Sequence, residues 1–251
     1  MTYRNPPLLE AVCDFGFGPR AKWDSRMIGL LSARFAQYPK LQEIQQIELG
    51  FDPQGVVLPS PSSSTRSRFW TATDDRLVQV GPRNLSVNRL RPYDSWEAYR
   101  TQIVQALGVY MEVTGADSVE QLGLTYVNQI EIPLDRAGDD RALTLDDYFA
   151  FRPEHSVFGM PSTESSISVV LGDPSGDEDA ARYEVQLRTL PAAEPAFRFQ
   201  LMLASRSSRP MLRSHDGALA WLDRTHAQIE TYFEASIQEA LRQLFDPEPT
   251  L

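Results

Sequence analysis

Hydrophobic and polar positions alternate along many segments of the chain, with the period of two that is typical of β-strands. The alternation is clearest at 9–17 and at 122–132. Further segments complete the set of predicted strands, at 43–57, 66–73, 76–80, 84–91, 167–171, 183–187 and 197–203. Turn-forming residues separate the three segments between 66 and 91, which predicts an antiparallel meander. The Pro/Ser-rich residues 59–65 predict a flexible loop.

Three longer segments have apolar residues at every third or fourth position, which predicts amphipathic helices. These segments are 25–38, 95–114 and 217–244. Each is preceded by a short polar side chain that can accept a hydrogen bond from the first turn of a helix. The candidate caps are Asp24 or Ser25, Asp94 and Asp216. For the second helix, Asp94 with Glu97 fits a capping box, and Gly115 is typical of a helix end.

The order of these elements, with hairpin-rich strands interrupted by helices, predicts an α+β fold. We expect one large, mostly antiparallel sheet with long helices packed on one face, and an opposite face that is solvated or open to a ligand. The prediction is a single domain over residues 1–251. The element order also suggests two similar halves, 1–115 and 116–251, although no aligned sequence repeat accompanies it.

Composition narrows the possible classes of protein. With 251 residues and 42% hydrophobic content, the chain can bury a sizeable core, which argues against intrinsic disorder. A single cysteine excludes a disulfide framework, a Cys-rich zinc site and an iron–sulfur cluster. The formal net charge of −10 argues against a protein that coats nucleic acid.

The sequence shows neither a signal peptide nor a membrane-spanning segment. The first seven residues, MTYRNPP, do not resemble the start of a signal peptide, and the longest apolar runs are far shorter than a membrane span. We therefore expect a cytoplasmic protein that has no association with a membrane.

The sequence contains no familiar catalytic or cofactor-binding motif. The chain has no phosphate-binding loop of the GxxxxGK[ST] type, no HExxH zinc motif, and neither a GxSxG nor an SxxK nucleophile motif. The acidic segment 173–179 lacks the spacing of a calcium-binding loop and predicts a solvated hairpin loop. We therefore assign no catalytic residue, no metal ligand and no cofactor. Enzyme activity stays open and is less expected than binding.

An arginine-rich meander is the first candidate binding surface. All but two of the 24 basic residues are arginine, which fits either coding bias or anion binding. Six arginines fall between positions 66 and 91: Arg66, Arg68, Arg76, Arg83, Arg89 and Arg91. Of this region, the residues singled out as candidates for binding are Arg66, Arg68, Phe69, Trp70 and Arg89. Arginines beside aromatic rings on a sheet can hold a single-stranded nucleic acid or an acidic peptide. The alternative is an ordinary solvated sheet face in an Arg-rich protein.

A second candidate site is a pocket between the C-terminal helix and the sheet. Tyr126 and Asn128 lie in the strongly alternating strand, and with Glu10 and Arg89 they are the proposed lining residues. The buried amide of Asn128 requires hydrogen-bond partners. It can find them in a ligand or in a purely structural network.

Two segments resemble a known protein family. Residues 5–12, NPPLLEAV, and residues 122–133, LGLTYVNQIEIP, are similar to the opening and to one strand of an uncharacterised, sporadically distributed bacterial family of proteins of about this length. Thr125 and Gln129 replace basic residues that are usual in that strand, which weakens a ligand role at these positions. The resemblance implies no established enzyme activity. The patchy distribution implies a mobile cassette, such as a defence island, a toxin–antitoxin-like pair or a biosynthetic cluster.

Three hypotheses about function follow. The leading one is a non-catalytic accessory protein that acts with a protein partner encoded nearby. The alternatives are a small-molecule-binding protein or cryptic enzyme that uses the pocket below the C-terminal helix, and a single-stranded nucleic-acid binder that uses the meander. The sequence leaves the oligomeric state open.

Overall fold

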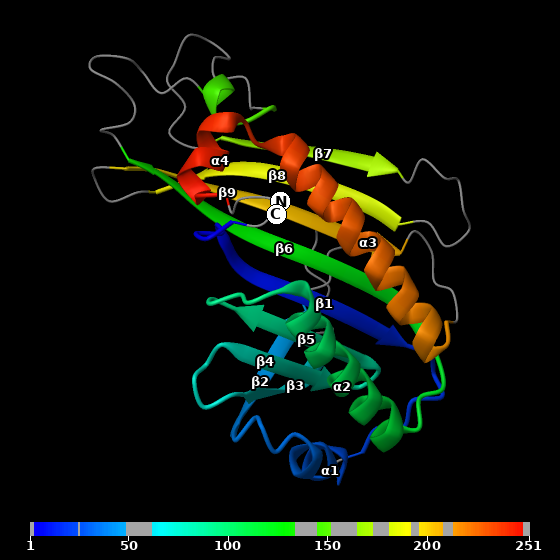
Figure 1. Ribbon diagram of the computed structural model, residues 1–251. Coiled ribbons are helices and arrows are strands. Elements are labelled where there is room, and N and C mark those ends of the chain that lie inside the picture. The colour runs from blue at the N-terminus through cyan, green and yellow to red at the C-terminus, as the bar shows by residue number, and fades with distance from the viewer. Residues whose placement is uncertain are drawn as a thin grey trace. The chain divides into compact units, whose positions relative to one another are not determined.

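The computed structural model describes residues 3–24, 26–48, 62–133, 145–151, 165–172, 181–191, 196–207 and 213–247. Within them, nine strands form one sheet in the hydrogen-bonded order β2-β3-β4-β5-β1-β6-β9-β8-β7 (Figure 1). The strands are β1 (Leu8–Phe17), β2 (Lys40–Glu48), β3 (Ser62–Trp70), β4 (Arg76–Gly81), β5 (Asn84–Leu90), β6 (Val119–Pro133), β7 (Ser166–Gly172), β8 (Ala181–Leu190) and β9 (Ala196–Ser207). The helices are α1 (Arg26–Arg34), α2 (Trp96–Thr114), α3 (His215–Ser236) and α4 (Glu239–Phe245), with a 3₁₀ turn, η2, at Leu145–Asp147.

The predicted mixed α/β class with a large antiparallel sheet is confirmed. The finer prediction, that long helices pack on one face, is not established by the structure. The helices range from the seven residues of α4 to the 22 residues of α3. The predicted last helix is in fact two helices, because the helix breaks after Ser236 and α4 begins with Gln238 as its cap. No helix in the described part of the chain is long and apolar enough to cross a membrane.

The chain divides into two compact units, each assembled from separate segments. The first unit comprises Met1–Ala11, Leu124–Ser208 and Trp221–Leu251, and the second comprises Val12–Gly123 and Arg209–Ala220. The predicted halves 1–115 and 116–251 stay a prediction. The acidic segment 173–179 lies outside the described residues, as do the segments 49–61 and 134–144.

The second unit contains the predicted meander. Strands β3, β4 and β5 pair antiparallel in sequence order, with Phe69 opposite Val78 and Val78 opposite Val87. The predicted loop at 59–65 is wrong in part, because Ser62–Thr65 belong to β3 and pair with β2. Backbone pairing with a neighbouring strand outweighs the weak strand propensity of a serine run, since strand propensity depends strongly on context.

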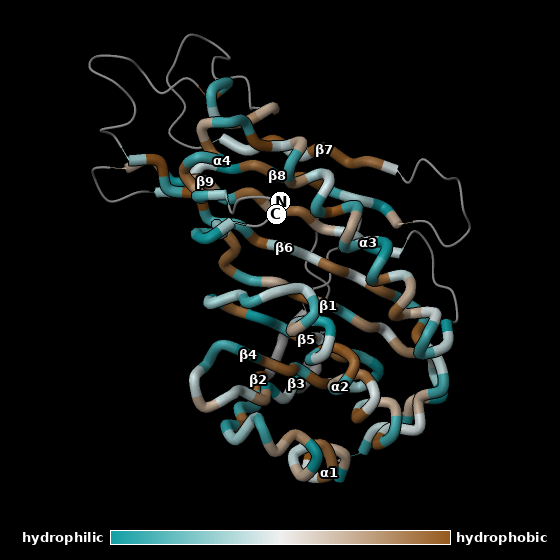
Figure 2. The backbone as a smooth tube through the Cα atoms, in the orientation of Figure 1, coloured by the Kyte–Doolittle hydropathy of each residue, from teal (hydrophilic) through white to brown (hydrophobic). Residues whose placement is uncertain are grey.

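Helix α2 packs against this meander through two buried tyrosines. The Tyr99 hydroxyl donates to the Val87 carbonyl at 2.8 Å, and the Tyr110 hydroxyl donates to the Gly81 carbonyl at 3.0 Å. Hydrophobic and polar stretches alternate along α2, as a helix buried on one side requires (Figure 2). Gly115 ends the helix in the left-handed conformation, with φ of 66°, as predicted.

The predicted caps of α2 and α3 are each displaced to a neighbouring serine. In α2 the Ser95 hydroxyl accepts from the Ala98 N–H at 3.2 Å, whereas Asp94 binds an arginine. In α3 the Ser214 hydroxyl accepts from the Gly217 N–H at 3.1 Å. The capping roles predicted for Asp94 and Asp216 are therefore wrong.

We expect Ser95→Ala to lower the free energy of unfolding by about 1 kcal/mol, since the substitution leaves an N–H of the first turn without its acceptor. Urea denaturation measures the difference. Ser95→Asp keeps an acceptor at the cap and is expected to unfold close to the wild type. Equal losses in both variants would show that the serine acts through something other than capping.

In the first unit, strands β7, β8 and β9 pair antiparallel in sequence order. The part of α3 that belongs to this unit packs on β6 and β8. The Tyr126 hydroxyl lies 3.0 Å from Nδ1 of His226, and the rings of Tyr183 and Tyr232 meet edge to face. Near the chain ends, the Tyr3 hydroxyl donates to the Glu234 carboxylate at 2.9 Å. These contacts fix α3 and the N-terminal segment within the unit.

Candidate functional site

A pocket of about 550 Å³ opens in the second unit between α1, the turn that follows it, β4 and α2. Its lining is polar and carries two positive charges. The polar residues that line it are Arg34, Gln37, Tyr38, Arg76, Thr101, Gln102 and Gln105. No Asp or Glu is among the described residues that line it. A concave site with a few convergent polar groups is the usual form of a small-molecule site.

Arg76 is the first residue of β4, and its side chain reaches the pocket. The side chain is 43% exposed, and its Nε lies 3.6 Å from Oδ2 of Asp75. Its Nε is buried and has no hydrogen-bond partner among the described residues. A guanidinium has five N–H donors. Arg76 therefore offers several donors that a ligand can engage.

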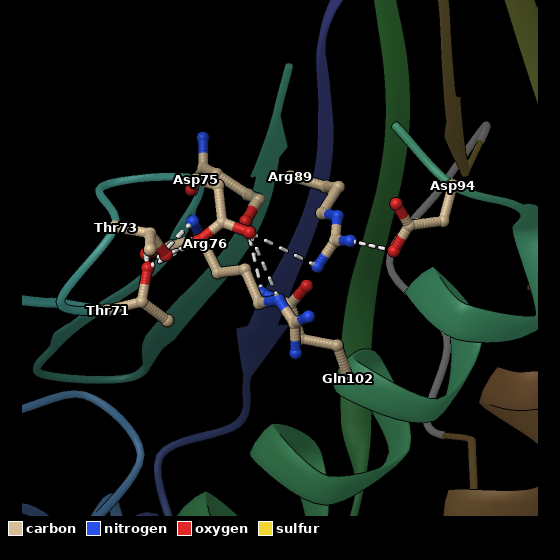
Figure 3. Close-up of polar contacts among 8 residues, drawn as sticks. Thr71, Thr73, Asp75, Arg76, Arg89, Asp94 and Gln102 are labelled. Carbon is tan, nitrogen blue, oxygen red and sulfur yellow. Dashed lines mark hydrogen bonds and ion pairs between the residues drawn. The ribbon is translucent and has the colours of Figure 1, made fainter. Parts of the chain in front are cut away.

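Asp75 holds Arg76 from the turn between β3 and β4 (Figure 3). The hydroxyl of Thr71 donates to Oδ1 of Asp75 at 2.7 Å, and the hydroxyl of Thr73 donates to the same atom at 2.5 Å. Burial by itself raises the pKa of Asp75, but the two hydroxyls and the charge of Arg76 outweigh it and hold this pKa below its ordinary value. Asp75 is therefore a carboxylate at neutral pH.

Arg89 supports the same turn from β5. It stands opposite Arg76 in the strand register and is only 3% exposed. Its guanidinium pairs with Asp94, and its Nη1 lies 3.9 Å from Oδ2 of Asp75. Asp75 thus lies between two guanidinium groups, as Figure 3 shows. This arrangement allows two arginines to stand side by side, because carboxylates offset their repulsion.

Gln102 and Tyr38 form the inner wall of the pocket, and each is 5% exposed. Nε2 of Gln102 donates to the Asn88 carbonyl at 3.1 Å. Its Oε1 is buried and has no hydrogen-bond partner among the described residues. Burial raises the pKa of Tyr38 to about 12, although a hydrogen bond with the Gln102 side chain and the charges of Arg76 and Arg89 act in the opposite direction. The phenol is therefore protonated at neutral pH and can both donate and accept.

The pocket lining supplies cationic N–H donors, a neutral phenol and amides, and its described residues include no cysteine, serine or histidine. The hydroxyl of Thr101, which also lines the pocket, donates to the Glu97 carbonyl at 2.8 Å. Across the described ranges, no group of three or more His, Cys, Asp or Glu side chains is placed to hold a metal ion. The arrangement suits recognition of an anion by a preorganised arginine.

The structure separates the residues predicted in the meander. Phe69 is fully buried, and its ring packs against Phe35. Arg66, Arg68 and Trp70 alternate with it along β3 and so point to the opposite side of the sheet. There, Nε of Arg68 donates to Oε1 of Gln79 at 2.8 Å. Arg89 alone among the predicted residues belongs to the cluster beside the pocket.

Tyr126 and Asn128 lie on β6 in the first unit and are both buried. Tyr126 contacts His226 through its hydroxyl, and Nδ2 of Asn128 donates to the Leu201 carbonyl at 3.1 Å. The amide thus finds the partner that its burial requires. These two side chains and Arg89 belong to different units, and Glu10 belongs to the first unit.

Sequence reasoning did not single out Arg34, Tyr38 or Gln102, and it counted Arg76 only as one arginine of the meander. Gln102 carried a usable signal. It falls within the apolar stripe of the predicted helix 95–114, three residues after Tyr99 and one before Ile103. A glutamine at a core position of a helix is a buried polar group that requires a partner.

We expect Asp75→Asn to lower the free energy of unfolding at pH 7 by about 2 kcal/mol, because it weakens charge-assisted hydrogen bonds. The pKa of Asp75 is lower in the folded state, so its stabilising contribution is present above the unfolded pKa of about 4 and is lost as pH falls through the folded pKa. The gap between wild type and variant should therefore shrink below about pH 4. Urea denaturation at several pH values measures it, and a gap that is independent of pH would contradict the assignment.

Comparison with known proteins does not identify a family for this chain. No protein-family model matches the chain, and no match was found among curated proteins. The family resemblance of residues 5–12 and 122–133 therefore stays a prediction.

Proposed function

We propose that the protein binds a small anionic ligand in the pocket between α1 and α2, and that it acts through binding rather than catalysis. One observation carries this proposal. The Arg76 side chain is partly exposed and is held beside the pocket by Asp75, yet its buried Nε has no hydrogen-bond partner among the described residues. Donors fixed in this way lose little conformational entropy when an anion binds them.

Because the cation in the pocket is an arginine, we expect the anionic group of the ligand to be a carboxylate or a phosphate. Arginine presents its N–H groups as a planar fork that matches two oxygens of such an anion. Arg34 brings a second positive charge to the pocket, but its guanidinium is already paired with Glu112 at 2.9 Å. Arg76 is therefore the principal anchor, and Arg34 contributes long-range attraction.

The acidic net charge of the chain does not oppose this proposal. At physiological ionic strength, charges on the surface are largely screened beyond about 8 Å. The local groups decide the affinity of the site, and the pocket lining has cationic but no anionic side chains. A net charge of −10 and an anion-binding pocket are therefore compatible.

A ligand screen with two variants tests the proposal. Thermal-shift measurements against organic acids and phosphate esters identify binders, and calorimetry gives their affinities. The variants are Arg76→Met and the control Arg20→Met, whose side chain is 81% exposed and pairs with Asp117 away from the pocket. We expect acids to bind the wild type and Arg20→Met alike and to bind Arg76→Met weakly. Failure of every acid to bind, or equal binding by both variants, would contradict the proposal.

The other functional predictions rest on the sequence. An accessory role beside a partner encoded nearby follows from the family resemblance and is compatible with ligand binding. Co-expression with the neighbouring gene products, followed by size-exclusion chromatography, tests it. Binding of single-stranded nucleic acid through Arg66 and Arg68 is tested by gel shift at low salt, where phosphate contacts are strongest.

A further inference from the structure

We infer that the ligand of this pocket carries a hydroxyl group next to its acidic group, and that Gln102 is the residue that selects it. The inference rests on the proposed function, since it identifies the class of ligand that the same pocket takes. It starts from the one buried acceptor of the pocket wall that has no donor among the described residues, Oε1 of Gln102. Buried polar groups of native proteins are almost always hydrogen-bonded.

A hydrogen bond to the backbone of β5 fixes the orientation of the Gln102 side-chain amide. Nε2 donates to the Asn88 carbonyl, which is part of β5, at 3.1 Å. Turning the amide over would place an oxygen against that carbonyl, and two acceptors cannot share a hydrogen bond. The Gln102 side chain also interacts with the Tyr38 hydroxyl. Its Oε1 has no hydrogen-bond partner among the described residues, so it is the atom left for a group of the ligand, and that group must donate.

Gln102 and Arg76 approach one another from opposite walls. The Gln102 side chain extends from α2 toward the end of the Arg76 side chain on β4, as Figure 3 shows. One side chain offers N–H donors and the other an acceptor. A ligand that satisfies both needs an anionic oxygen and a hydrogen-bond donor on neighbouring atoms.

The donor on the ligand is expected to be neutral. An ammonium group at this place would lie among Arg76, Arg34 and the nearby Arg89, and like charges repel. The carboxylate of Asp75, beside Arg76, is already engaged by two threonine hydroxyls and two arginines. A hydroxyl avoids this repulsion. The shared chemistry is thus that of a hydroxycarboxylate or of a phosphate ester with a neighbouring hydroxyl.

Calorimetry with matched pairs of probes tests the inference. L-malate is compared with succinate, and glycerol 3-phosphate with propyl phosphate, so that the two arms distinguish a carboxylate from a phosphate. The proteins are the wild type, Gln102→Met, and Gln121→Met as a control on an exposed position of β6. For the probe pair that binds, we expect the wild type and the control to bind the hydroxylated probe with about tenfold higher affinity than its partner. Gln102→Met should bind both members of the pair equally.

The outcomes separate this inference from the proposed function. Arg76-dependent binding without preference for the hydroxyl in the wild type would overturn the inference and leave the proposed function intact. A preference that persists in Gln102→Met would also overturn it, because another group would then read the hydroxyl. Failure of all four probes and of every other acid would overturn both. If Gln102→Met does not fold, the preference of the wild type and the response of the Gln102 side-chain amide signal in an NMR titration decide the question.

Discussion

Replacing Arg89 by methionine is expected to lower the free energy of unfolding by about 3 kcal/mol. Arg89 is almost fully buried, and its guanidinium pairs with Asp94 and lies close to Asp75. Methionine fills a similar length but carries no charge, so Asp75 loses one of its two cations in a site that is shielded from water. The cost falls mainly on Asp75, whose side chain is 17% exposed and would lose a compensating charge, whereas Asp94 is 54% exposed and stays solvated.

Urea denaturation measures this loss. Arg20→Met is the matched control, because its side chain is exposed and an exposed ion pair contributes little, about 0–1 kcal/mol. If Arg89→Met proved as stable as Arg20→Met, the cluster around Asp75 would not be a structural support of the meander.

Arg76→Met is expected to act on binding instead of stability. Loss of a charge-assisted hydrogen bond is worth roughly 1.5–3 kcal/mol, which corresponds to a loss of affinity of about 10-fold to 100-fold. The Arg76 side chain is half-exposed, and its ion pair with Asp75 is long, so we expect stability to change by less than about 1 kcal/mol. Calorimetry on the acid that binds best, together with urea denaturation, measures both quantities.

The two substitutions remove the same charge from opposite residues of one strand pair. Arg89 should therefore affect mainly folding, and Arg76 mainly binding. Large effects of Arg76→Met on stability would show that both arginines are structural, and the pocket would lose its proposed anchor.

Local patterns were sufficient to predict much of the fold. The alternation at 9–17 and 122–132 corresponds to β1 and β6, because side-chain alternation is a property of a single strand. Gly115 ends α2 as predicted, because its left-handed conformation depends on neighbouring residues alone. The meander followed from three short strands with turn residues between them.

Features that depend on distant residues could not be predicted in this way. Asp94 fits the local pattern of a helix cap, but Arg89 engages its carboxylate and the cap passes to Ser95. The Pro/Ser-rich segment was predicted as a loop, yet pairing with β2 draws Ser62–Thr65 into a strand. Both errors arise where a tertiary contact overrides a local preference.

The candidate site was the least predictable part. Its residues come from the end of α1, the turn after it, the start of β4 and the middle of α2, and only the tertiary packing of these elements brings them together. The arginine count in the meander pointed to the region beside this pocket, but it did not separate Arg76 from the other arginines. Arg66 and Arg68 lie on the other side of β3 from Phe69, whereas the count did not distinguish Arg76.

The most direct test of the central claim is an NMR titration of the ¹⁵N-labelled protein with L-malate or glycerol 3-phosphate, whichever binds more tightly. The account predicts that the Nε–H signal of Arg76 and the side-chain amide signal of Gln102 shift with the same saturation curve, while the Nε–H signal of Arg20 stays in place. Shifts that gather elsewhere in the protein and leave Arg76 and Gln102 unchanged would contradict it.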